Sequence, residues 1–219
     1  MYDVNIKLHG NVNDVNIRAA MSRQRRPYHH GNLPTTLVAN GLALVESAGI
    51  AALSLREVAS RARVSAAAVY RHFADKEALL AAIAAQGFAK LNTDFEAALA
   101  AKDSGDALSR LRALGTAYVD LALGHPGLFR LMFASRQTSG ARDARLDEEA
   151  SRAYRTLEAS VAACFAGPIN KKAISATTVA AWSMVHGYAM LRLDGQLARF
   201  PPDLLPDAPS ILTSLIPKT

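Results

Sequence analysis

Apolar residues recur every three or four positions along most of the chain, and glycines, prolines and polar residues divide this pattern into segments. Such spacing places the apolar side chains on one face of an α-helix. The first segment runs from Leu33 to Ala48, with Asn32 as a good N-cap and Gly49 as the residue that ends the helix. No stretch alternates apolar and polar residues as a β-strand does, so the pattern predicts an all-α protein.

Two short helices are predicted next, each with its own cap. Residues 54–57, Ser-Leu-Arg-Glu, match a capping box, in which the serine hydroxyl accepts from the glutamate N–H and the carboxylate reaches back to the serine N–H. Residues 63–65 form a tight turn, Ser65 caps a helix over Ala66–Phe73, and Asp75 caps the helix that follows. Two capped helices joined by a three-residue turn predict a helix-turn-helix module.

The remaining sequence stays helical in pattern. A long helix follows Asp75, and its apolar residues form one stripe, at Leu80, Ala84, Phe88, Leu91, Phe95 and Leu99. Further helices are expected around residues 111–121, 126–133, 146–164, 174–189 and 210–216. The run from Ala173 to Leu191 has no charge, but its serines, threonines and histidine favour a buried helix over a membrane span. We therefore expect a helix-turn-helix domain over residues 22–78 and a C-terminal helical domain over residues 79–219 that binds a ligand and dimerises.

The N-terminal 21 residues differ from the rest of the chain. They are rich in asparagine and show no sustained helical period, which predicts a disordered leader. Met21 is an alternative to Met1 as the start of translation. Three arginines then precede the first predicted helix and form a short basic arm, namely Arg23, Arg25 and Arg26.

Positive charge is concentrated near the predicted helix-turn-helix. Lysine and arginine exceed aspartate and glutamate by 25 to 19, and residues 22–78 hold eight basic and four acidic residues, which is +4 of the net +6. Such a field suits a phosphate backbone or an anionic membrane surface, and composition alone does not choose between them. The single cysteine, Cys164, excludes an intramolecular disulfide, and no signal peptide is present, so we expect a cytoplasmic protein with no membrane partner.

The second helix of such a module enters the major groove of DNA with its N-terminal residues nearest the base edges. Here those residues are small and allow close approach of the backbone: Ser65, Ala66 and Ala67. Polar residues that follow are placed to meet phosphates on either side of the groove: Tyr70, Arg71, His72 and Lys76. The N-terminus of the helix that begins near Lys76 adds N–H groups and a positive dipole end.

These residues carry a resemblance to a known family. The segment LSLREVASRARVSAAAVYRHFADKEALLAAI closely resembles the DNA-binding segment of the TetR family of bacterial regulators. The resemblance implies DNA contacts at Ser54, Ser65, Ala66, Ala67, Tyr70, His72 and Lys76, to which Arg56 and Arg71 add positive charge. Two positions depart from the family, since Arg63 and Ala67 stand where glycine is frequent. Arg63 therefore adopts either a strained positive φ or a different turn.

The resemblance extends into the second half of the chain. PYHHGNL, HPGLFRLMF and Trp182 with His186-Gly187 are similar to a TetR/AcrR subgroup with a tryptophan, histidine-glycine (WHG-type) C-terminal domain. It implies a homodimer joined through the last two predicted helices. It also implies a small-molecule effector and repression of transcription at a pseudo-palindromic operator.

Several residues are candidates for an apolar effector pocket between the C-terminal helices, and each taken alone is equally compatible with core packing. They are Tyr118, Phe129, Met132, Phe133, Trp182, His186 and Met190. Trp182 and His186 share a helix face, where they form a ligand cage, a packing cluster or part of a dimer seam. Tyr70 is expected to bury its ring and offer its hydroxyl, and Phe73 and Cys164 are expected to be buried.

No cofactor or metal site is predicted. His29 and His30 are adjacent, so their side chains point apart, and no acidic or cysteine ligand lies close in sequence. No nucleophile-and-base pattern or phosphate-binding glycine loop occurs, so we expect no enzyme. Two alternatives remain at this point. One is a helical enzyme or small-molecule carrier whose basic front serves an anionic substrate, and the other is a peripheral membrane protein that uses the basic arm.

Overall fold

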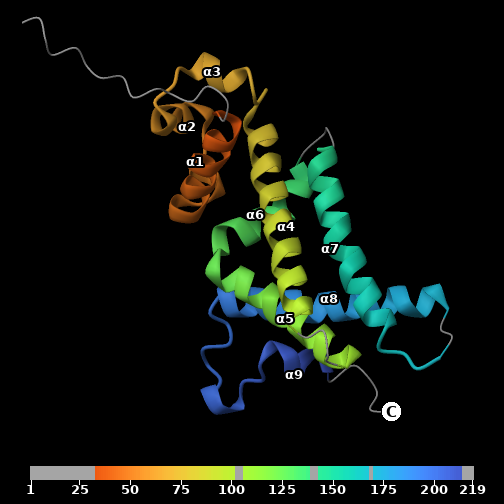
Figure 1. The fold of residues 1–219 in the computed structure, drawn as a ribbon. Helices are drawn as coiled ribbons and strands as arrows, with labels where there is room; N and C mark the ends of the chain where they lie inside the picture. Colours follow the sequence, from red (N-terminus) through yellow and green to blue (C-terminus); the bar gives the residue numbers. More distant parts are fainter. Residues whose placement is uncertain (1–32, 102–105, 139–142, 168–169, 214–219) are drawn as a thin grey trace, which may run out of the picture. The chain divides into compact units, whose positions relative to one another are not determined.

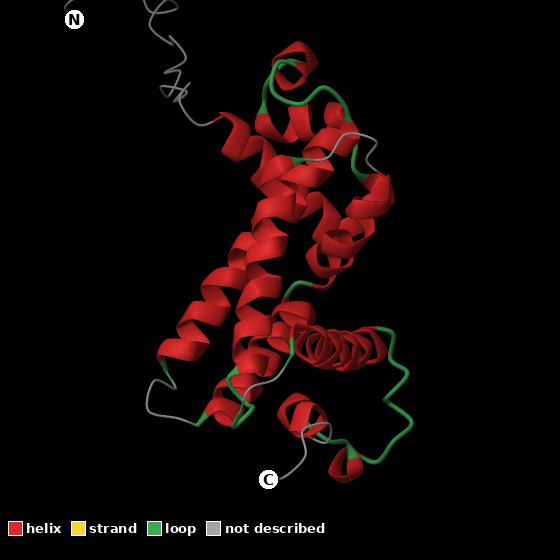
Figure 2. Ribbon diagram, turned by 90° about the vertical axis from the view of Figure 1, so that its right-hand side faces the viewer, coloured by secondary structure: helices red, strands yellow, loops and turns green. Residues whose placement is uncertain are grey.

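The structure, a computed structural model, describes residues 33–101, 106–138, 143–167 and 170–213. These residues form helices joined by turns, and no strand occurs among them, which confirms the all-α prediction (Figures 1 and 2). The elements are α1 (Leu33–Ala48), η2 (Ile50–Ala52), α2 (Leu55–Ala62), α3 (Ala66–Tyr70), α4 (Lys76–Ala100), α5 (Ala107–Gly124), α6 (Pro126–Thr138), α7 (Ala144–Ala162), α8 (Lys171–Leu193), η3 (Pro202–Leu204) and α9 (Ala208–Thr213).

Some predictions fall outside the described residues. These are the leader over residues 1–21, the arm of Arg23, Arg25 and Arg26, the pair His29-His30, and the end of the last predicted helix at residues 214–216.

The predicted caps begin the helices of the N-terminal module. Ser54 Oγ accepts from Glu57 N at 3.2 Å, Ser65 Oγ accepts from Ala68 N at 3.2 Å, and Asp75 Oδ1 accepts from Ala78 N at 2.7 Å. The predicted second hydrogen bond of the capping box, from the Ser54 N–H to the Glu57 carboxylate, is wrong. The Glu57 carboxylate accepts from Arg61 Nε at 3.1 Å instead. Glutamate four residues before arginine on a helix is a favourable pair, and here it takes the carboxylate away from the Ser54 N–H.

The turn between α2 and α3 is built on a left-handed residue. Arg63 has φ 56° and ψ 40°, so the sequence alternative of a positive φ is the one that occurs. The Arg63 N–H donates to Ser60 O and the Val64 N–H donates to Ala59 O, both at 3.0 Å. These two bonds form a Schellman motif, which stabilises the αL conformation even though the residue is not glycine.

α3 is shorter than predicted. It ends at Tyr70 rather than Phe73, and His72 N and Phe73 N donate to Val69 O as the chain turns away. Asp75 has to adopt an extended conformation, with φ −150°, in order to cap α4. The chain therefore leaves the helical conformation before Asp75, and His72 lies in the turn.

α4 is the longest helix among the described residues, and it packs against α5, α6 and α7 (Figure 1). Because neighbours cover several of its sides, the buried surface is wider than the predicted stripe and includes Leu79 and Ile83. Gly87 allows close packing against α6, since a Cβ there would lie 2.8 Å from Met132 Sδ. Leu99, which was predicted in the stripe, is only partly buried near the end of the helix.

The described residues from Pro34 onward group into one compact unit, and the two domains predicted from the sequence share α4 within it. α7 ends at Ala162, two residues before Cys164, which is therefore only partly buried rather than in the core. Within the described ranges, no helix has both the length and the apolar character needed to cross a bilayer.

Candidate DNA interface and ligand cavity

The second helix of the helix-turn-helix exposes its N-terminal residues. Ser65 and Ala67 are exposed and Ala66 is partly buried, whereas Ala68 and Val69 are buried against the rest of the module. The side chains predicted to face bases are therefore on the accessible side of α3. Because they are small, the backbone of α3 is free to approach a neighbouring surface closely.

The residues after this end of α3 are also accessible. Tyr70 is 54% exposed, so the expectation that its ring is buried is wrong, and Phe73 is only partly buried. The short α3 explains both results, because Tyr70 ends the helix and Phe73 lies beyond it. Arg71 and His72 are exposed in the turn.

Positive side chains surround this surface. Arg56, Arg63 and Arg71 are exposed, and none of them has an ion-pair partner in the described part of the chain. Lys76 is the first residue of α4, and its Nζ lies 3.4 Å from Ala51 O. The exposed N-cap Ser54 completes the set of predicted contacts.

A cavity of about 550 Å³ lies among the C-terminal helices, with walls from α4, α5, α6, α7, α8 and α9. Three of the predicted ligand residues line it, namely Tyr118, Phe133 and Trp182. The other four do not: Phe129 and Met132 are fully buried, and His186 and Met190 are partly buried. The aromatic lining also includes three residues that were not predicted, which are Phe88, Phe95 and Tyr154.

Sequence signals for two of the missed residues were present. Phe88 and Phe95 lie seven residues apart on the predicted apolar stripe of α4, so they share a face. The periodicity showed that this face is covered, but it could not show that a cavity separates it from its neighbours. Tyr154 gave no such signal.

The hydroxyl of Tyr118, a residue of the cavity wall, contacts two side chains of α8. It lies 2.8 Å from His186 Nδ1 and accepts a hydrogen bond from Trp182 Nε1 at 3.3 Å. Burial raises the pKa of Tyr118 and lowers the pKa of His186, so both groups are neutral at neutral pH. The His186 ring packs 4.6 Å from the Phe133 ring, centroid to centroid.

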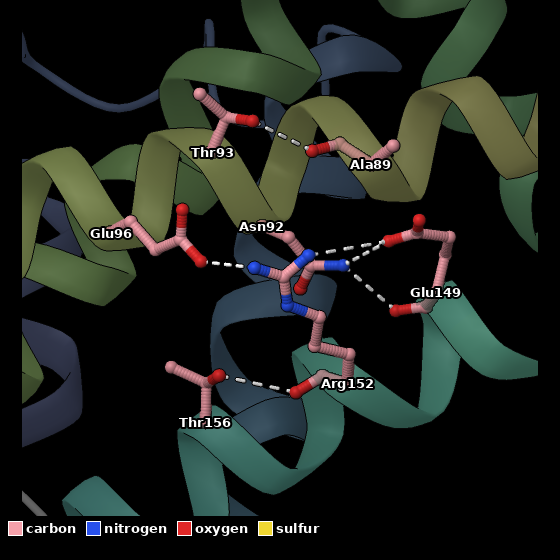
Figure 3. A network of polar contacts seen from close by, with 7 residues as sticks. All are labelled: Ala89, Asn92, Thr93, Glu96, Glu149, Arg152 and Thr156. Atoms are coloured by element: carbon pink, nitrogen blue, oxygen red, sulfur yellow. Dashed lines mark hydrogen bonds and ion pairs between the residues drawn. The ribbon is translucent and has the colours of Figure 1, made fainter.

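A polar network links α4 to α7 (Figure 3). Asn92 Nδ2 donates to Glu149 O at 3.0 Å and to Glu149 Oε2 at 2.8 Å, while Arg152 pairs with Glu96 and lies 4.0 Å from Glu149 Oε2. Asn92 is 2% exposed, and its Oδ1 has no hydrogen-bond partner among the described residues. This contact was not predictable from local sequence, because its partners lie 57 residues apart.

A second polar link joins α1 to α6. The Glu46 carboxylate accepts from Gly127 N at 3.0 Å and from Leu128 N at 3.1 Å, and so caps the first turn of α6. Gly127 fits closely here, since a Cβ would lie 2.7 Å from Val45 O. α6 is thus held by the helix-turn-helix module at one end, and its Phe133 lines the cavity further along.

No group of three or more histidine, cysteine, aspartate or glutamate side chains is arranged to hold a metal ion in the ranges that the structure describes.

Comparison with known proteins identifies both halves of the chain. The profile of bacterial regulatory proteins of the tetR family matches residues 37–83, and the profile of the tetracyclin repressor-like C-terminal domain matches residues 111–208. A solved protein of unknown function from Rhodococcus sp. RHA1 is 33% identical with a TM-score of 0.71, over 86% of this chain and 94% of its own. The chain belongs to the TetR family.

Other solved structures share the fold at lower identity. The TetR family transcriptional regulator PfmR from Thermus thermophilus is 20% identical, with a TM-score of 0.56 over 81% of this chain and 93% of its own. The multidrug binding protein EbrR, solved with imidazole, is 22% identical, with a TM-score of 0.54 over 85% of this chain and 96% of its own. No protein with a curated function matches the sequence.

Membership of the TetR family assigns the helix-turn-helix of α2 and α3 to DNA binding, and the protein is a DNA-binding transcriptional regulator.

Proposed function

We propose that this regulator is a homodimeric repressor that binds a pseudo-palindromic operator and is released by a small molecule in the C-terminal cavity. One observation carries the proposal. α4 begins at Lys76, beside the DNA-binding helices, and the same helix supplies Phe88, Leu91 and Phe95 to the cavity wall. A ligand that displaces this wall moves the helix that positions the DNA-binding module.

On the operator, the exposed N-terminal end of α3 lies in the major groove. Ser65 reads polar base edges, and the methyl groups of Ala66 and Ala67 contact thymine methyls. The flanking residues bind phosphates and fix the register: Ser54, Arg56, Tyr70, Arg71, His72 and Lys76. Because the base-facing residues offer few hydrogen bonds, the arm of Arg23, Arg25 and Arg26 supplies part of the sequence preference.

A face of α8 supports the proposed dimer. Small residues follow one another at helical spacing on its accessible side, at Ala176, Ala180, Ser183 and Gly187. Nothing lies within 4 Å of the position that a Gly187 Cβ would occupy, so this glycine is not needed for packing within the described part of the chain. In the proposed dimer, α8 of a second protomer packs against this face with its α9 alongside, and Gly187 allows the two α8 helices to approach closely. Two-fold symmetry then sets the recognition helices about 34–36 Å apart, one turn of the duplex.

Effector release is proposed to act through α6 as well as through α4. Phe133 contacts the contents of the cavity, and the Glu46 carboxylate ties the start of α6 to α1. An effector that binds better when the recognition helices are wrongly spaced weakens operator binding by its difference in affinity for the two conformations. Since the target is duplex DNA, we infer that the protein works in the cytoplasm.

Selection of bound duplexes from a random pool tests this function. The full chain is expected to enrich a sequence with two inverted half-sites whose centres lie about 10 base pairs apart, or a multiple of one turn. Enrichment of a single unpaired half-site would contradict the dimer, and failure to enrich any sequence would contradict operator recognition. A reporter placed behind the enriched site distinguishes repression from activation.

A further inference from the structure

The described lining of the cavity carries a positive side chain without a negative one. Among its described lining residues, Arg155 on α7 is the one side chain that is ionised at neutral pH, and no acidic residue lines the cavity. Arg155 is exposed and has no ion-pair partner in the described part of the chain. Arg152, one turn earlier on the same helix, is neutralised by Glu96 and Glu149. Of these two neighbouring arginines, the one at the cavity is therefore free to bind an anion.

The rest of the wall is mostly apolar, and its polar side chains carry hydroxyl or indole groups rather than ionic ones, namely Ser151, Tyr154, Tyr118 and Trp182. Aromatic rings from five helices, including Phe88, Phe133 and Trp182, surround the space. The Tyr118 hydroxyl is engaged by both His186 and Trp182, and both titratable members of that group are neutral. A polar group on a ligand consequently finds its strongest partner at Arg155.

Charge decides among ligand classes. A cationic ligand would meet the Arg155 guanidinium with no carboxylate to balance it, and a neutral ligand would leave the guanidinium to solvent. An apolar body with one carboxylate satisfies both the aromatic wall and Arg155, since guanidinium and carboxylate groups match in geometry. We propose that the effector is a hydrophobic monocarboxylate whose carboxylate pairs with Arg155. This inference rests on the proposed function for its role as an effector, but the binding itself does not depend on DNA.

The single tryptophan of the chain gives a direct assay, because Trp182 lines the cavity. Its fluorescence is titrated with three probes that share one body and differ in charge: 4-phenylbutyrate, 4-phenylbutanol and 4-phenylbutylamine. We expect the carboxylate to bind at least about fivefold more tightly than the alcohol, a modest factor because Arg155 is exposed. The amine is expected to bind most weakly.

Two variants separate the Arg155 contact from general charge effects. Arg155→Gln is expected to remove the preference for the carboxylate over the alcohol while leaving the affinity for the alcohol unchanged. Arg145→Gln makes the same change in charge at an exposed residue of α7 that does not line the cavity, and it is expected to keep the wild-type preference. Thermal melts of both variants check that the fold is intact, because a melting temperature close to that of wild type is required for the comparison.

The proposal is overturned if the alcohol or amine binds as tightly as the carboxylate, if Arg155→Gln keeps the preference, or if none of the three probes changes Trp182 fluorescence. A separate measurement of operator affinity tests the proposed function. If 4-phenylbutyrate binds through Arg155 but operator affinity is unchanged, the ligand class stands and release by the effector fails. If a cationic or neutral ligand releases the operator, release stands and the ligand class fails.

Discussion

The contact between Glu46 and the start of α6 gives a prediction whose size follows from its geometry. Glu46→Ala removes an acceptor that is bonded to two backbone N–H groups, at 3.0 and 3.1 Å, and that lies at the positive end of a helix dipole. Loss of a capping side chain costs about 0.5–2 kcal/mol, and hydrogen bonds to charged groups lie at or above the top of that range. The Glu46 side chain is 25% exposed, so water replaces part of the loss. We expect destabilisation by about 2 kcal/mol.

Urea denaturation measures this change at a fixed protein concentration, since dimer stability depends on concentration. With a slope of about 2 kcal/mol per molar urea, the Glu46→Ala midpoint falls by about 1 M. Glu46→Gln retains one carbonyl acceptor and is expected to lose roughly half as much. Glu148→Ala is the control, because Glu148 is exposed on α7 and makes no ion pair among the described residues.

Amide hydrogen exchange locates the effect. Gly127 and Leu128 are expected to lose protection in Glu46→Ala, while amides in the middle of α4 change only by the global loss of stability. A midpoint shift no larger than that of Glu148→Ala, or unchanged exchange at Gly127 and Leu128, would refute the reasoning.

Three further changes test other parts of the account. Arg63→Gly removes the cost of holding a side chain in the αL conformation, about 1–2 kcal/mol, and adds about 0.5–1 kcal/mol of unfolded-chain entropy. The urea midpoint is therefore expected to rise slightly. Arg63→Val keeps a side chain in the αL conformation and should lower the midpoint. Burial lowers the pKa of His186, so as the pH falls below about 6.5 the unfolded chain is protonated first and stability declines until the folded-state pKa is reached. His186→Gln should remove that part of the decline when the free energy of unfolding is measured by urea titration at successive pH values. The same dependence of this free energy on pH in wild type and variant would contradict the prediction. Gly187→Leu should dissociate the dimer in analytical ultracentrifugation without unfolding the chain, while Gly124→Leu, which also has open space around its Cβ position, should remain dimeric.

Local chemistry made the starts of α2, α3 and α4 predictable. Serine and aspartate at an N-cap bond to N–H groups three residues later, so Ser54, Ser65 and Asp75 could be placed from neighbouring residues alone. The conformation of Arg63 could not, because either of two turns suits the same sequence and the choice depends on the Schellman bonds that close around it. The exposure of Tyr70 followed from the early end of α3, which periodicity did not reveal.

Contacts between distant segments were beyond sequence reasoning. Glu46 meets α6 across 81 residues and Asn92 meets Glu149 across 57, and nothing in either local sequence specifies the partner. The cavity was predicted only in part for a related reason. Tyr118 and Phe129 both occupy apolar helix positions, yet the first lines the cavity and the second is fully buried in the core. Periodicity identifies covered positions, whereas a cavity depends on how well the covering side chains fill the space.

The salt dependence of binding to a selected operator duplex tests the central claim most directly, that this chain holds DNA through the segment from Ser54 to Lys76. Filter binding across a salt series is expected to give a steep negative slope of log affinity against log salt, and Lys76→Ala should flatten it by about one unit. Lys90→Ala makes the same change at an exposed lysine that pairs with Asp94 on α4, and it should leave the slope unchanged. Binding no stronger than that of a neutral control protein, or equal slopes for wild type and Lys76→Ala, would contradict the account.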